Sequence, residues 1–163
     1  MLRTRQRAFT LVEMLVVIAI VGIATGITFA LAAADPRDVA LREAREFARG
    51  LDFATKTAQW RHELLGISAD GDLIRYWRRD PGSTRWLEAD DETLRRWTLP
   101  RPVVAQALDY AGRPIAAGSV IPLRPSGRNE PFAFAIDAGD WRARVSSDPL
   151  NRISITGPTR RSP

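Results

Sequence analysis

A long apolar run near the N-terminus constrains this chain more than any other feature. From Met14 to Ala34 the sequence has no charged side chain. As a helix, these 21 residues would extend roughly 30 Å, about the thickness of the hydrocarbon core of a bilayer. Arg3, Arg5 and Arg7 precede the run without an acidic neighbour, so the positive-inside rule predicts a cytoplasmic N-terminus. The run therefore predicts one membrane-spanning helix, with the rest of the chain on the far side.

Glu13 stands at the start of this run. A lone carboxylate deep in a bilayer costs roughly 2.5–3.5 kcal/mol, so we expect this one to have a partner. Small residues at the far end of the run, Ala30 to Ala34, leave a second interpretation open, a cleaved signal peptide. The aromatic Phe9 and the acidic Glu13 at the cytoplasmic end favour a retained anchor.

The stretch Arg7-Ala8-Phe9-Thr10-Leu11-Val12-Glu13, followed by the apolar run, resembles the N-terminus of the type IV prepilin family. The resemblance implies that residues 1–8 are a cytoplasmic leader and that a prepilin peptidase cuts between Ala8 and Phe9. It further implies methylation of the new Phe9 amine and retention of residues 9–34 as a transmembrane helix. In this family the carboxylate equivalent to Glu13 meets the N-terminal amine of a neighbouring subunit during assembly.

Ala8 departs from the family pattern, which almost always has Gly before the cut. A peptidase that approaches the backbone closely prefers a residue without a β-carbon, and Ala is the smallest alternative. We therefore expect processing to occur, but more slowly than with Gly.

About 130 residues remain after the span, enough for one domain with its own core. The chain has no cysteine, which excludes a disulfide framework, a zinc–cysteine site and a thiol nucleophile. Its formal net charge of +5 falls to +2 once Arg3, Arg5 and Arg7 are removed with the leader. Most of the excess positive charge thus indicates how the chain is oriented in the membrane, rather than nucleic-acid binding.

Residues 35–63 are expected to form an amphipathic helix on the periplasmic side. Asp35 and Pro36 suit the start of a new helix; alternatively, Pro36 kinks one continuous helix. We favour a kinked or briefly interrupted helix. Apolar residues recur at spacings of three and four, which predicts a buried face, at Ala40, Ala44, Phe47, Leu51, Ala54 and Ala58. The charged residues predict an opposite, exposed face, with Arg42, Glu43, Arg45, Glu46, Arg49 and Lys56.

From residue 64 to 156 the pattern changes to short apolar stretches separated by Gly, Pro and Asp turns, which predicts antiparallel strands. The expected strands are 64–68, 73–78, 86–88, 95–99, 103–108, 120–123, 132–137, 141–145 and 153–156. One long helix followed only by strands indicates an α+β fold with an antiparallel β-sandwich-like globular domain. Residues 157–163 are expected to be a flexible tail.

The later chain resembles the H-type minor pseudopilins of type II secretion, a branch of the same family. An apolar strand enters a Pro-Ser-Gly turn at 120–127, an alternating strand follows at 131–134, and a strand bearing a tryptophan closes the domain at 139–145. The resemblance implies a non-enzymatic subunit without a cofactor, held in the bacterial inner membrane with its C-terminal domain in the periplasm. It would assemble at or near the tip of the pseudopilus and help to export folded proteins.

The partners implied by this resemblance are other pseudopilins, the prepilin peptidase and methylase, the inner-membrane assembly platform and secreted cargo. Nucleic acid is not expected. One alternative is a minor pilin of a type IV pilus, active in pilus assembly or DNA uptake, in which Arg152, Arg160 and Arg161 would contact phosphates. A membrane-anchored enzyme is a further alternative, but the sequence shows no constellation of catalytic residues.

Several residues have a structural and a functional interpretation. His62 is the single histidine and is expected at a surface or helix end. The acidic segments 70–72 and 90–92 could hold calcium, but neither follows the spacing of a calcium loop. The five tryptophans are expected mostly in core or sheet packing, with one or two exposed at a subunit contact.

Overall fold

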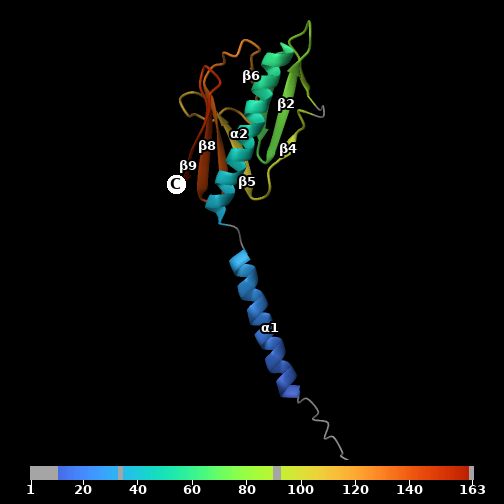
Figure 1. Ribbon diagram of the computed structural model, residues 1–163, viewed down its shortest axis with the longest axis vertical. Coiled ribbons are helices and arrows are strands. Elements are labelled where there is room, and N and C mark those ends of the chain that lie inside the picture. The colour runs from blue at the N-terminus through green and yellow to red at the C-terminus, as the bar shows by residue number, and fades with distance from the viewer. Residues whose placement is uncertain (1–10, 33–34, 90–92, 162–163) are drawn as a thin grey trace, which may run out of the picture. The chain divides into compact units, whose positions relative to one another are not determined.

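The computed structural model describes residues 11–32, 35–89 and 93–161, and the side chains of 26–32 lie outside that description. The chain divides into two compact units, Met1–Ala34 and Asp35–Pro163. The described part of the first unit is helix α1, Leu11–Ala32 (Figure 1). The described part of the second contains helix α2 and nine strands. Their bounds are α2 Pro36–Arg61, β1 Leu65–Asp70, β2 Leu73–Arg79, β3 Trp86–Glu88, β4 Trp97–Thr98, β5 Val103–Leu108, β6 Ile121–Leu123, β7 Phe132–Ala138, β8 Trp141–Ser147 and β9 Ile153–Arg160.

Helix α1 covers most of the apolar run and is 22 residues long. Among the residues that the structure describes, no helix meets the combined length and apolarity required to cross a membrane. The span expected over 9–34 therefore stays a prediction.

Helix α2 has an N-cap of its own at Asp35. The Oδ1 atom of Asp35 accepts a hydrogen bond from the backbone N–H of Arg37 at 2.9 Å, and Pro36 occupies the first turn. This satisfies one of the free N–H groups at the helix start. The helix ends at Arg61, where His62 takes a left-handed conformation with φ 53°. The expectation of His62 at a helix end is confirmed.

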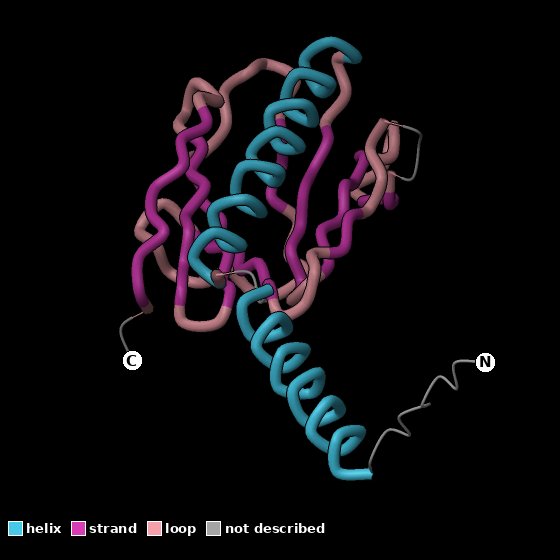
Figure 2. Tube along the Cα trace, turned by 60° about the horizontal axis from the view of Figure 1, so that its bottom comes forward, coloured by secondary structure: helices cyan, strands magenta, loops and turns pink. Residues whose placement is uncertain are grey.

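All the strand pairs are antiparallel and form two sheets in the described chain. The first has the order β3-β2-β1-β6, with β4 also pairing with β2, and the second has the order β5-β7-β8-β9. The sheets meet where β1 approaches β5, and the N–H of Ala105 donates to the carbonyl oxygen of Gly71 at 2.8 Å. Figures 1 and 2 show α2 lying along the two sheets, with strands to either side. The α+β, sandwich-like expectation is confirmed.

Phe47 of α2 connects the helix to both sheets. Its ring centroid lies 4.7 Å from that of Phe134 in β7 and 6.4 Å from that of Trp97 in β4. Phe47 and Phe134 are fully buried, and each such side chain stabilises the fold by about 1.5–3 kcal/mol. The six apolar positions predicted for the buried face of this helix are all inside the core.

The prediction for Glu43 of this helix is wrong. We expected it on the exposed, charged face, but it is only 6% exposed. Its Oε1 atom accepts a hydrogen bond from Nε of Arg42 at 3.2 Å. Glu43 lies one position before the buried Ala44, so the helical periodicity places it at the border of the two faces, where it lines a pocket together with Tyr76 and Trp97.

The prediction of a flexible tail from Gly157 is wrong for residues 157–160, which form the second half of β9. This strand pairs with β8 up to Thr156 and again from Thr159, with a register shift between. Gly157 has φ +97° there, and a β-carbon would lie 2.9 Å from the carbonyl oxygen of Arg142. An edge strand can pass a proline at such an irregularity and resume its pairing. Residues 162–163 lie outside the description.

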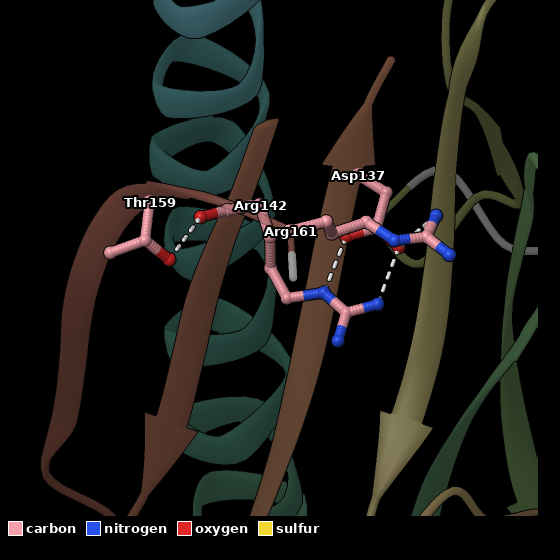
Figure 3. Close-up of polar contacts among 4 residues, drawn as sticks. All are labelled: Asp137, Arg142, Thr159 and Arg161. Carbon is pink, nitrogen blue, oxygen red and sulfur yellow. Dashed lines mark hydrogen bonds and ion pairs between the residues drawn. The ribbon is translucent and has the colours of Figure 1, made fainter. Parts of the chain in front are cut away.

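A buried carboxylate holds the end of the chain against the second sheet. Nε and Nη2 of Arg142 donate to the two carboxylate oxygens of Asp137 at 2.7 and 2.8 Å, and Nη1 of Arg161 donates to Oδ2 at 3.5 Å (Figure 3). The Asp137 side chain is 8% exposed. Its hydrogen bonds raise the pKa of Arg142. The backbone N–H of Arg161 also donates to the carbonyl oxygen of Asp140 at 2.7 Å. We call Asp137, Arg142 and Arg161 the carboxylate clamp.

Candidate assembly surfaces

The predicted processing site cannot be placed, because Ala8 and Phe9 lie outside the described residues. Glu13 is placed, in the first turn of α1, and its side chain is exposed. A carboxylate in the first turn of a helix interacts favourably with the helix dipole, by about 0.3–1 kcal/mol. The first turn of this helix is therefore a favourable position for an acidic side chain.

The described side chains of α1 form an apolar surface on every side. All residues from 11 to 25 are exposed within this chain. A helix that is apolar all round is normally buried by its surroundings. The largest exposed side chains belong to Leu11, Val12, Met14, Leu15, Val16, Val17, Ile18, Ile20, Val21 and Ile23. Together with Glu13, these residues make up the first candidate surface for assembly.

A second candidate surface is a pocket in the globular unit, near β6 and the start of β7. It has a volume of about 460 Å³. We call it the apolar pocket, and its apolar lining consists of Ile115, Val120, Ile121, Pro122, Pro131 and Phe132. Sequence reasoning missed it, because its residues come from separate turns and strand ends that share no periodicity. The nearest signal is the Val-Ile-Pro-Leu stretch, which predicted only a strand.

Polar residues surround the mouth of the apolar pocket. Tyr110 is 75% exposed. The Glu130 side chain is 93% exposed and lies 3.9 Å from Arg124, at the limit of an ion pair. Asp109 accepts hydrogen bonds from the backbone N–H and from Nε of Arg113, each at 2.8 Å. The backbone hydrogen bond from Arg113 is the main cause that lowers the pKa of Asp109, and the two carboxylates at the mouth, Asp109 and Glu130, lie opposite the guanidinium groups of Arg113 and Arg124.

The outward face of α2 carries two exposed aromatic side chains. Trp60 is 92% exposed and Phe53 is 46% exposed, and a separation of seven residues puts them on the same side of a helix. The other four tryptophans are half-buried; Trp77, for example, donates from Nε1 to Oγ of Ser68 at 2.8 Å. The expectation of one or two exposed tryptophans is confirmed by Trp60, whereas its role at a subunit contact stays a prediction.

The three arginines considered for phosphate contacts are not equivalent. Nε of Arg152 lies 2.6 Å from Oδ2 of Asp148, and Arg161 belongs to the carboxylate clamp. Arg160 ends β9, where it pairs with Trp141. Two of the three guanidinium groups are thus partly neutralised within the chain, which weakens them as phosphate ligands.

The first acidic segment considered for calcium forms the end of β1 and the turn into β2. Asp70 pairs with Leu73 there, and Gly71 has φ +62°. Within the described ranges, no group of three or more His, Asp, Glu or Cys residues is arranged to hold a metal ion. The second acidic segment, 90–92, lies outside those ranges.

Known proteins resemble this chain both in its N-terminal segment and in its fold. A family model described as the prokaryotic N-terminal methylation motif matches residues 3–29. Two solved structures of the minor pseudopilin EpsH from the type II secretion system of Vibrio cholerae share the fold, with TM-scores of 0.59 and 0.61 and 15% sequence identity. They cover 76% and 77% of this chain and 99% and 100% of their own. No curated protein sequence matches. The chain thus carries a prepilin-type methylation motif and has the fold of a minor pseudopilin, as the sequence resemblance predicted.

Proposed function

We propose that this chain is a minor pseudopilin subunit of a type II secretion pseudopilus, which assembles at or near the tip and helps to export folded proteins across the outer membrane. The observation that carries the proposal is the combination of two features on one chain. These are the N-terminal methylation motif at residues 3–29 and a globular unit with the fold of EpsH. The subunit would act by assembly rather than by catalysis and would need no cofactor.

The N-terminal unit supports the assembly part of this proposal. Residues 9–34 would anchor the chain in the inner membrane and later pack among the helices of neighbouring pseudopilins, with the C-terminal domain in the periplasm. The small residues of this segment, which include Ala19, Gly22 and Ala24, allow the close approach of helices. A prepilin peptidase would cut between Ala8 and Phe9 and methylate Phe9.

Glu13 is the one charged residue between Ala8 and Asp35 in the sequence. In the proposed assembly its carboxylate pairs with the N-terminal amine of a neighbouring subunit, which offsets the cost of a charge among apolar helices. Substitution of Glu13 should therefore impair assembly more than it impairs folding, because the globular unit has its own core.

The alternative function is that of a minor pilin of a type IV pilus, in pilus assembly or DNA uptake. The observation in its favour is the group of arginines near the C-terminus, Arg152, Arg160 and Arg161. Under this alternative, the purified domain should retard DNA in a salt-dependent way, and replacement of Arg160 and Arg161 by Ala should abolish the shift.

The experiment that tests the proposal is a deletion strain of the host, in which exoprotein release and surface pili are measured together. We expect loss of release with intact pili, and rescue by the native chain but not by Glu13→Ala. Glu46→Gln, at an exposed carboxylate of α2, is the matched control and should rescue. Loss of pili with normal release would support the pilin alternative instead.

A further inference from the structure

A pocket of about 600 Å³ lies between α2 and the side of the first sheet that holds β4. We call it the α2–β4 pocket. Its helical lining includes Glu43, Gly50 and Phe53, whose spacings of seven and three place them on one side of α2. Tyr76 of β2 and Trp97 of β4 lie on its other side. Two polar side chains of this pocket, those of Glu43 and Tyr76, are buried with unused hydrogen-bonding capacity.

Glu43 is a buried acid with little compensation. It is only 6% exposed, and acidic side chains are almost never buried to this degree unless they are paired. Its Oε1 atom accepts one hydrogen bond, from Nε of Arg42 at 3.2 Å, and the Arg42 side chain is 59% exposed. Its Oε2 atom accepts no hydrogen bond from the residues that the structure describes. Because a carboxylate has about four acceptor sites, Glu43 has room for a further donor.

The hydroxyl group of Tyr76 is the second of these groups. Tyr76 is 6% exposed, and within the described chain its hydroxyl forms no hydrogen bond. Burial raises the pKa of Tyr76 to about 12, so the hydroxyl is protonated and available as a donor at neutral pH. A β-carbon on Gly50 would lie only 2.8 Å from it. Glycine is unfavourable inside a helix, and here it leaves room for the hydroxyl.

These two groups lie too far apart for one small ion. Glu43 and Gly50 are separated by seven residues of helix, a rise of roughly 10 Å, and the Tyr76 hydroxyl lies beside Gly50. An arginine or lysine residue of a polypeptide spans such a distance, because a flexible apolar stem joins its cation to its backbone. The pocket also offers apolar surface for this stem, on the half-buried Trp97 and on Phe53, which is 46% exposed.

We propose that the α2–β4 pocket binds an arginine or lysine residue of a partner protein. The cation donates to Oε2 of Glu43, the stem packs on the Trp97 ring, and the Tyr76 hydroxyl donates to the backbone carbonyl oxygen of the same residue. This occupant supplies the hydrogen bonds that both buried groups lack, and a tryptophan ring attracts a cation. The inference involves only the unit Asp35–Pro163 and does not rest on the secretion role proposed above.

The two arginines in the lining affect this site differently. Arg49 already forms an ion pair within α2, at 2.9 Å, so its charge is offset. Arg95 is exposed and forms no ion pair with the described residues. It therefore repels the bound cation, although solvent weakens this repulsion. Removal of the Arg95 charge should strengthen binding, whereas removal of the Glu43 charge should weaken it.

NMR titration of the isotope-labelled full chain, purified in a nonionic detergent, tests the site with the capped tripeptide acetyl-Ala-Arg-Ala-amide. The readout is the indole N–H resonance of Trp97, identified by its loss in Trp97→Phe, and we expect a saturable shift. The same peptide with citrulline keeps the shape but lacks the charge, and it should bind at least about tenfold more weakly. Methylguanidinium represents a free small cation. It should also bind at least about tenfold more weakly, because it has neither the stem nor the carbonyl group.

Matched variants of the chain separate the contacts. Glu43→Gln keeps the size of the side chain and should weaken binding of the arginine peptide about tenfold or more. Tyr76→Phe removes only the hydroxyl and should weaken binding about fivefold, whereas Arg95→Ala should strengthen it about twofold. Asp52→Asn is the control, at a carboxylate of the same helix that is 48% exposed and does not line the pocket; it should leave binding unchanged. Circular dichroism shows whether each variant is folded.

Three results would overturn the proposal: no saturable shift with the arginine peptide, equal binding of the citrulline peptide, or unchanged binding by folded Glu43→Gln. If Glu43→Gln does not fold, unchanged affinity in both Tyr76→Phe and Arg95→Ala would overturn it equally. Methylguanidinium that binds as tightly as the peptide would also overturn it, because a free small cation would then be the occupant.

Discussion

Arg142→Ala should be among the most destabilising single changes on the surface of this domain. The substitution leaves the Asp137 carboxylate, 8% exposed, with the more distant Arg161 at 3.5 Å as its remaining clamp partner. Breaking a buried ion pair by removing one member costs about 3–5 kcal/mol. The Arg142 side chain is 40% exposed and Arg161 can move closer, so we expect a loss of roughly 2–3 kcal/mol.

Removal of the other member of the pair, Asp137, should lower the free energy of unfolding less than removal of Arg142. This difference between the two substitutions is what the carboxylate clamp predicts. Asp137→Ala removes the buried charge itself, and Arg142 can turn its guanidinium group into water. We expect a loss of about 1–2 kcal/mol, close to that of one charge-assisted hydrogen bond. The double variant should resemble Asp137→Ala, with a coupling energy above about 1 kcal/mol between the two sites.

Urea unfolding of the unit Asp35–Pro163 measures these free energies. A loss of 1 kcal/mol corresponds to a fall in melting temperature of roughly 3–5 °C in a domain of this size. Arg152→Ala is the matched control, because the Arg152 side chain is 79% exposed and a surface pair contributes less than about 1 kcal/mol. The reasoning would be refuted if Arg142→Ala cost no more than this control, or less than Asp137→Ala.

Three further predictions concern titration and processing. Burial raises the pKa of Tyr76 to about 12 from 10.0, so the unfolded chain ionises first and stability should fall as pH rises across that interval; in urea melts, Tyr76→Phe should lessen this alkaline loss, and an unchanged loss would contradict it. The backbone hydrogen bond from Arg152 is the main cause that lowers the pKa of Asp148 from 3.8. The Asp148 carboxylate therefore stabilises the folded domain above that pH, and this stabilisation is lost as the pH falls below it. Asp148→Asn should therefore weaken the domain at neutral pH, and its effect in thermal melts should become smaller as the pH is lowered below 3.8; an effect that does not change with pH would argue against this. Ala8→Gly should speed leader removal in a pulse-chase experiment, because a β-carbon is absent at the cut; an equal rate would show that this position does not limit the peptidase.

The elements with strong periodicity could be predicted from the sequence. The spacing from Ala40 to Ala58 gave the buried face of α2, because helical geometry alone decides which residues share a side. The hairpin of β1 and β2 was predictable from the Gly and Asp residues between its strands at 70–72. The stretch up to Glu13 indicated the methylation motif, which the family model matches.

Features that depend on long-range contacts could not be predicted in this way. Glu43 is buried beside residues from distant parts of the chain, such as Tyr76 and Trp97, which the helix pattern does not contain. Gly157 continues a strand because β8 lies beside it. A Gly-Pro pair looks the same in a sequence whether it ends a chain or forms a bulge. The apolar pocket joins Ile115 to Pro131 from separate segments, so only the folded chain reveals it.

The intact mass and N-terminal sequence of the protein recovered from membranes test the central claim most directly. A prepilin-type subunit should begin at Phe9 and carry one extra methyl group, despite Ala8 before the cut. A chain that still begins at Met1 would contradict processing by a prepilin peptidase. A chain that begins near Asp35 would show that the apolar run is a cleaved signal peptide, and the proposed assembly role of Glu13 would then be lost with it.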